Sequence, residues 1–289
     1  MLRAYYQLTK PRVMMANALT AAAGFLLASN YVRYFHAGRF VALVAGSSLI
    51  IAAACAINNY LDRDIDNRME RTKNRVTVTG EVGKAGAITF TAVSGILGAL
   101  ILIFWTNWLV VAAGVVGFVD YVWLYGVFSK RRSVHGTLVG SISGAIPVLA
   151  GYLAVTDNFD LGAALVFASL FFWQMPEFYS IAIYRRNEYA AAGVPVISVV
   201  KGVRNTKFQI FIYTLLFVLS SVLLGIFGYA GLFYGVVMLL LGVYWLWIAA
   251  HGLKVKPAAN DAWARRMFRF SMIIILAYCL MLSVGGLLP

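Results

Sequence analysis

The sequence has few charged residues and almost no cysteine, and each shortage excludes a class of protein. Charged residues make up 12% of the chain and the mean hydropathy is +0.81, whereas a soluble domain has about 25% charged residues. A soluble enzyme is therefore excluded. The net charge of +13 is spread over short segments between apolar runs, so there is no basic nucleic-acid-binding module. Cys55 and Cys279 lie apart within apolar runs, which argues against a disulfide and a cysteine metal site.

The chain does have a series of long apolar runs. About 20 helical residues cross the roughly 30 Å core of a bilayer, and nine runs reach that length. We expect an all-α, polytopic membrane protein in which nine transmembrane helices form one bundle, a single domain over residues 1–289. The expected spans are 13–31, 40–61, 86–105, 108–128, 136–154, 161–183, 208–227, 231–251 and 269–288.

The basic residues predict the orientation of this bundle in the membrane. If the N-terminus is cytoplasmic, every lysine and arginine except Arg33 and Arg39 lies on the cytoplasmic side or near it. The positive-inside rule then places the C-terminus outside. Two cytoplasmic loops, at about 62–85 and 184–207, are long and polar, and such loops tend to carry function.

The segment from Asn58 to Arg75, NNYLDRDIDNRMERTKNR, is the strongest candidate site. Asn58, Asp62 and Asp66 recur every four residues, so a helix that continues past Tyr60 would present them on one face. Two carboxylates one turn apart repel each other unless a cation lies between them. A Mg²⁺ ion bound to a phosphate suits this position between the carboxylates, because Mg²⁺ takes one or two protein carboxylates and completes its shell with phosphate and water oxygens. The bases that follow could bind that phosphate: Arg71, Lys73 and Arg75.

The second long loop and the end of the helix before it carry further candidates. Glu177 lies within an apolar span, where a carboxyl is costly and so suggests a function, although a structural acid is the alternative. Glu188 follows eleven residues later, which is about three helical turns, and would lie near the same face. We expect Glu188 to face Asp62 and Asp66 as a further metal ligand, the alternative being a solvated loop acid.

The run at 108–128 ends in a cluster of aromatic and basic residues. Lys130 and Arg131 lie where they could neutralise a diphosphate at the cytoplasmic interface. Asp120 either lines a cavity or pairs with a base at the helix end. The next run carries Gly140, Gly144 and other small residues four apart, a spacing typical of close helix packing.

These motifs together resemble the UbiA superfamily of intramembrane prenyltransferases. The resemblance includes YYQLTKPRV from Tyr5, the Asn58 motif, HGTLVGSISGAIPVLAGY from His135, and WQMP with YAAAGVPV from Trp173. Within the superfamily, the sequence of these motifs is most similar to that of the branch that prenylates haem.

The resemblance implies a Mg²⁺-dependent membrane enzyme that transfers farnesyl from farnesyl diphosphate to a vinyl group of haem B. It implies that Asn58, Asp62, Asp66 and Glu188 hold the metal and that Arg185 joins the diphosphate-binding bases. It also implies an aromatic pocket, for which Tyr121, Tyr125, Trp173, Glu177 and Phe178 are candidates. The resemblance implies a location in a bacterial inner membrane. It also implies that a haem A synthase or a terminal oxidase assembly receives the product.

The sequence departs from this family after Trp173. The family has histidine after the proline, whereas Pro176 is followed here by Glu177. That change bears on how haem is placed and favours one alternative, a related prenyltransferase with another acceptor such as a quinone precursor. A transporter without catalysis is a separate alternative, which would show broken helices and ion sites at the midplane of the membrane.

Overall fold

A computed structural model describes residues 1–287, and within that range every regular element is a helix. Nine helical segments are long and apolar enough to cross a membrane, as the hydropathy predicts. One is a composite of α6, the π-helix η1 and the short α7. The spanning elements are α2 (Pro11–Val32), α3 (Ala37–Leu61), α5 (Lys84–Trp105), α6 (Trp108–Val119), η1 (Asp120–Ser129), α7 (Lys130–Arg132), α8 (Gly136–Thr156), α9 (Leu161–Tyr184), α12 (Gly202–Ile226), α13 (Leu232–Gly252) and α14 (Asn260–Val284).

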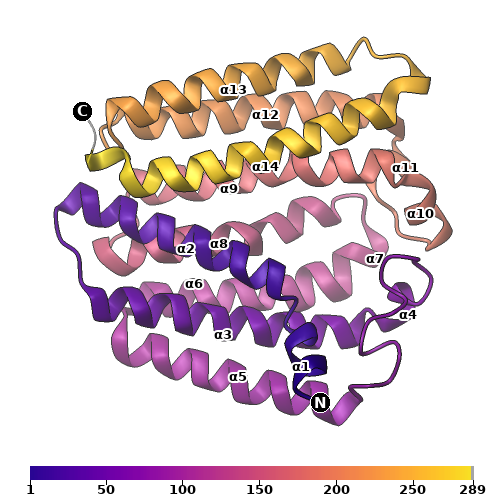
Figure 1. The fold of residues 1–289 in the computed structure, drawn as a ribbon, viewed down its shortest axis with the longest axis horizontal. Helices are drawn as coiled ribbons and strands as arrows, with labels where there is room; N and C mark the ends of the chain where they lie inside the picture. Colours follow the sequence, from indigo (N-terminus) through magenta and orange to yellow (C-terminus); the bar gives the residue numbers. More distant parts are fainter. Residues whose placement is uncertain (288–289) are drawn as a thin grey trace.

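Short helices gather mostly at one end of the bundle. α4, α7, α10 and α11 lie together at the right-hand end of Figure 1, where the two long polar loops also lie. This arrangement brings residues from distant parts of the chain to one face of the bundle. The short elements are α1 (Leu2–Leu8), α4 (Arg63–Asp66), α10 (Arg186–Ala191), α11 (Ile197–Val200), η2 (Pro257–Ala259) and η3 (Gly285–Leu287).

The long helices lie side by side, in an order that only partly follows the chain. α3 packs against α5, α2 against α8, and α9 against α8, α12 and α14 (Figure 1). α2 touches both α8 and α14, so it joins the first and last parts of the bundle.

Helix boundaries follow local capping where the sequence provides it. The expected break at Thr106 and Asn107 is confirmed: α5 ends before it, and the Asn107 side chain accepts a hydrogen bond of 3.0 Å from the amide of Val110. By contrast, α12 and α14 begin earlier than the expected 208 and 269. Apolar runs mark only the membrane-buried part of a helix, and these two helices continue beyond it into the basic segments.

Glycines allow a close contact between α2 and α8. A Cβ atom built on Gly151 would collide with the backbone oxygen of Ala21, and one built on Gly24 would collide with that of Val148. Backbone atoms cannot move aside as a side chain can, so both positions require glycine. The prediction of close packing through the small residues of 136–154 is confirmed.

Candidate functional site

The first acidic motif keeps its helical register past the end of α3. The amide of Asp62 donates to the carbonyl of Asn58 and that of Asp66 donates to the carbonyl of Asp62, both at 2.9 Å. The three side chains therefore lie on one face, as their spacing predicts. All three are buried, with exposed fractions of 2% for Asn58, 1% for Asp62 and 3% for Asp66.

Basic side chains neutralise these two carboxylates. Lys130 Nζ lies 2.5 Å from Asp62 Oδ2, and Arg75 Nη1 lies 2.5 Å from Asp66 Oδ2. Arg131 Nη2 is 3.8 Å from Asp62 Oδ1. The acids come from the end of α3 and from α4, while Lys130 and Arg131 come from α7, so the pairs join two segments about 70 residues apart in sequence.

Asp64, between the two buried acids, is in a different environment. Arg131 Nη1 and Nη2 donate to its two carboxylate oxygens at 2.7 and 2.8 Å. These bonds hold the pKa of Asp64 at about 2, although 55% of the side chain is exposed. Asp64 thus fixes the guanidinium of Arg131 at the rim of the site.

The π-helix η1 brings two tyrosines toward the buried acids. Tyr121 and Tyr125 have ring centroids 5.9 Å apart, and Lys130 Nζ lies 6.0 Å from the centre of the Tyr125 ring. A Cβ atom on Gly126 would lie 3.1 Å from Asn58 Nδ2, so this glycine permits the close approach of η1 to α3. π-Helical geometry is rare and is frequently found at functional sites, mostly as single turns, whereas η1 is ten residues long. The amino-acid pattern of 108–132 gives no sign of this one.

Lys10 is a member of the site that the sequence did not reveal. Its ammonium donates to Asn58 Oδ1 at 2.9 Å and lies 3.4 Å from the hydroxyl of Tyr121. Burial lowers the pKa of Lys10 to about 8. Its backbone is left-handed, with φ of 51°, which is costly for a residue other than glycine. A basic residue directly before the proline that starts the first span was the available signal.

Asp120 is buried in the helix packing. Its Oδ2 accepts a hydrogen bond of 3.0 Å from the amide of Ser143 in α8. Of the two alternatives for Asp120, pairing with a base at the helix end is wrong, because no base within residues 1–287 forms an ion pair with it.

The second polar loop packs against the first. Ile65 and Met69 of the first loop form a buried apolar cluster with Ala192 and Val194 of the second. Burial raises the pKa of Tyr189, and the neighbouring charges of Arg71 and Lys130 oppose that rise. The expectation that both long loops belong to one site agrees with these contacts.

Glu188 lies in this region, but in the short helix α10 and not on a continuation of α9. α9 ends at Tyr184, and Arg185 adopts a non-helical conformation before α10 begins. The proposal that Glu177 and Glu188 share a continuous helix face is therefore wrong. Glu188 Oε2 instead accepts from Arg185 Nη1 at 2.8 Å, while Glu188 Oε1 is buried without a hydrogen-bond partner.

The oxygen atoms of the first motif fit a hard divalent cation. Asp62 Oδ1 is buried without a hydrogen-bond partner, and it shares its helix face with Asp66. Mg²⁺ needs only one or two protein carboxylates when a phosphate completes its shell. No three acid, histidine or cysteine side chains in the described part of the chain are grouped to hold a metal. Glu188 as a shared ligand therefore stays a prediction.

The remaining predicted residues lie outside the ion-pair cluster. Arg71 is exposed, and Lys73 pairs with Glu70 at 2.7 Å. Trp173 donates its indole N–H to the carbonyl of Ser271 at 3.0 Å and so packs α9 against α14. The roles of these residues at the diphosphate and in the pocket stay predictions.

Glu177 and Phe178 lie about two helical turns before the end of α9 at Tyr184, where the second polar loop begins. Gln174 of the same helix bonds to Ser141 of α8, and Trp173 bonds to α14. At 100° per residue, Glu177 points between these two neighbours, on the side where α2 touches both α8 and α14. It is partly exposed and Phe178 is 44% exposed. Their place in a substrate pocket also stays a prediction.

A bundle of membrane-spanning helices with paired buried carboxylates and bases at one end is the arrangement of an intramembrane prenyltransferase. The UbiA prenyltransferase family matches residues 17–273. The chain is 44% identical to the protoheme IX farnesyltransferase of Klebsiella pneumoniae, over 100% of this chain and 97% of the relative. It is also 44% identical to that of Escherichia coli K12, over 100% and 96%. The chain belongs to the UbiA prenyltransferase family and, within it, groups with the protoheme IX farnesyltransferases.

Solved structures share the fold at low sequence identity. A digeranylgeranylglyceryl phosphate synthase superposes with a TM-score of 0.83 and 18% identity, covering 99% of this chain and 98% of that one. A UbiA homologue from Archaeoglobus fulgidus, bound to DMAPP and Mg²⁺, gives a TM-score of 0.73 at 15% identity, covering 97% and 99%. The expected all-helical, UbiA-like membrane fold is thus confirmed for the part of the chain that the structure describes.

Proposed function

We propose that the protein transfers the farnesyl group of farnesyl diphosphate to a vinyl group of haem B, with addition of water, to give haem O and diphosphate. The full-length similarity to protoheme IX farnesyltransferases carries this proposal. The buried acids and bases at one end of the bundle support it, because they provide the groups that a diphosphate leaving group needs.

The carboxylate cluster supports a diphosphate site at this end of the bundle. Asn58, Asp62 and Asp66 would hold Mg²⁺, which supplies positive charge beside the departing diphosphate. Lys130, Arg131 and Arg75 now lie on the carboxylates and could turn to the phosphate oxygens when a metal takes their place. Once turned to the bound diphosphate, these positive groups would need little further reorganisation as negative charge builds on the leaving group.

The reaction breaks one carbon–oxygen bond, the π bond of the vinyl group and one O–H bond of water, and it forms one carbon–carbon and one carbon–oxygen bond. The C1–O bond of farnesyl diphosphate breaks and its electron pair leaves with the diphosphate. The terminal vinyl carbon of haem bonds to C1, and water adds to the adjacent carbon and loses a proton. The rings of Tyr121 and Tyr125 lie beside the acids and could shield the allylic cation, since aromatic faces attract cations and exclude water.

The surroundings proposed for this activity follow from its substrates. We propose that the protein lies in the cytoplasmic membrane of a bacterium with its carboxylate end inside. The product would pass to an enzyme that oxidises haem O, such as a haem A synthase, or to a terminal oxidase assembly.

A direct assay tests the proposal. Purified protein is incubated with farnesyl diphosphate, Mg²⁺ and haem B, and haem O is detected by mass. We expect product only when all three are present. Product with a quinone precursor but not with haem would contradict the proposed acceptor. Glu177, which stands where the family has histidine, gives that alternative its only support.

A further inference from the structure

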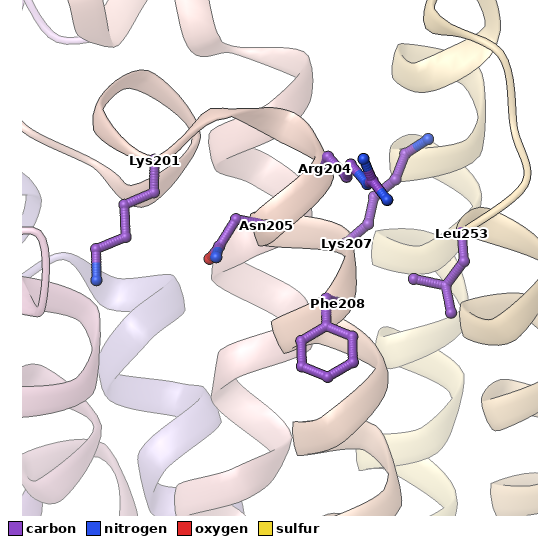
Figure 2. A pocket seen from close by; sticks show the side chains of 6 residues that line it. All are labelled: Lys201, Arg204, Asn205, Lys207, Phe208 and Leu253. Carbon is purple, nitrogen blue, oxygen red and sulfur yellow. The ribbon is translucent and has the colours of Figure 1, made fainter.

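A hollow of about 590 Å³ lies where α12 begins and α13 ends. None of its lining residues belongs to α3, α4 or α7, so it is separate from the carboxylate site. Figure 2 shows basic and polar side chains around the first turns of α12 and an aromatic ring deeper along the same helix. The lining residues are Lys201, Arg204, Asn205, Lys207, Phe208 and Leu253.

The lining carries three positive charges and no negative one. Within residues 1–287, none of Lys201, Arg204 and Lys207 forms an ion pair with a carboxylate. Lys207 is 5% exposed and donates to the carbonyl of Val255 at 2.9 Å. Its ammonium also lies 5.5 Å from the centre of the Trp263 ring, so Lys207 adds positive charge to the lining while the exposed Lys201 and Arg204 offer the hydrogen-bond donors. Such a group of bases favours an anion with several oxygen atoms.

The apolar part of the lining distinguishes a lipid from a soluble anion. Phe208 is 55% exposed and Leu253 is 44% exposed. Phe208 lies one helical turn after Arg204, on the membrane side of Lys201 and Arg204, because α12 runs from Gly202 into its membrane span. A phospholipid would place its phosphate among the bases and its acyl chains against these two side chains. A soluble phosphate would use only the bases.

We propose that this hollow binds the headgroup of an anionic phospholipid from the leaflet on the same side as the carboxylate site. Basic pockets between membrane helices on the cytoplasmic side suit such headgroups. The bound lipid would hold the start of α12 to the end of α13. The proposal does not depend on the reaction that the protein catalyses.

Native mass spectrometry of the full-length protein in detergent tests the proposal. Phosphatidylglycerol is titrated into wild-type protein and into the double variant Lys201→Gln/Arg204→Gln. Both side chains are exposed, so their loss leaves the fold intact, and thermal unfolding checks this. We expect roughly 30-fold weaker binding in the variant, at about 1 kcal/mol for each base and 1.4 kcal/mol for each tenfold change.

A matched control removes the same charge nearby. Lys254→Gln/Lys256→Gln takes two exposed lysines from the adjoining loop, outside the hollow. We expect it to bind phosphatidylglycerol as wild type does. An equal loss in both double variants would overturn the proposal, since it would mean only a general attraction to surface charge.

Two further measurements separate a lipid from a soluble phosphate. Phe208→Asn should weaken phosphatidylglycerol binding without changing the binding of inorganic phosphate. Phosphatidylcholine should bind wild-type protein more weakly than phosphatidylglycerol. Displacement of phosphatidylglycerol by inorganic phosphate at an equal concentration would overturn the assignment to a lipid.

Discussion

Replacement of Asp62 by asparagine is the sharpest test of the carboxylate site, and Asp64 provides its control. Both acids contact Arg131, and either exchange removes one negative charge from the same short segment. They differ in burial, since the side chain of Asp62 is 1% exposed and that of Asp64 is 55% exposed. Only Asp62 lies on the face shared with Asn58 and Asp66.

The expected effects differ by at least an order of magnitude. Loss of one group that stabilises transition-state charge costs about 2.7–4 kcal/mol, so we expect Asp62→Asn to lower turnover roughly 100- to 1,000-fold. An exposed ion pair contributes ~0–1 kcal/mol, so Asp64→Asn should stay within about fivefold of wild type. Asp62→Glu, which keeps the charge, should fall between them.

The assay is haem O formation at saturating farnesyl diphosphate and haem B, with Mg²⁺ varied. Asp62→Asn also leaves Lys130 without its carboxylate, and loss of one partner of a buried pair can cost about 3–5 kcal/mol of stability. Turnover is therefore measured well below the unfolding temperature of each variant. Wild-type turnover in a folded Asp62→Asn protein, or equal losses in both variants, would refute the assignment of the metal site.

Four further outcomes are expected. Lys10→Met should raise the KM for farnesyl diphosphate at least tenfold, because it removes the ammonium beside Asn58; an unchanged KM would place Lys10 outside the substrate site. Chelation of Mg²⁺ should abolish haem O formation, and Mg²⁺ addition should restore it. Glu177→His should change the KM for haem B while that for farnesyl diphosphate holds, and the reverse result would contradict a role at the acceptor. Gly151→Ala should destabilise the fold by about 1–3 kcal/mol in thermal or denaturant unfolding, whereas Gly95→Ala, whose Cβ would meet only Ala53 Cβ at 3.6 Å, should be close to neutral.

Local spacing predicted the parts of the site that lie within one helical segment. Asn58, Asp62 and Asp66 could be placed on one face because the helical hydrogen bonds continue through Asp62. Apolar run length predicted the spans for a similar reason, since a helix must satisfy its backbone hydrogen bonds inside the bilayer.

Contacts between distant segments could not be predicted from spacing. Lys10 lies 48 residues before Asn58, and only the packing of the bundle brings its ammonium there. The second loop was expected to begin at about residue 184, but the placement of Glu188 assumed that the helix continued through it. No proline or glycine marks the break at Arg185, and the argument from a continuous helix failed for Glu188. Partners such as Lys130 and Asp62 were both chosen as candidates, but their direct pairing depends on tertiary structure.

The π-helix η1 determines the direction in which the side chains after it point, relative to the side chains of α6 before it. In this span, the α-helix α6 packs against α8, and at the other end Lys130 must point toward Asp62. Deletion of one residue would rotate everything after it by about 100° relative to everything before it. The wide turns therefore let one continuous span follow two separate alignments, one to its neighbours in the membrane and one to the acids at its end.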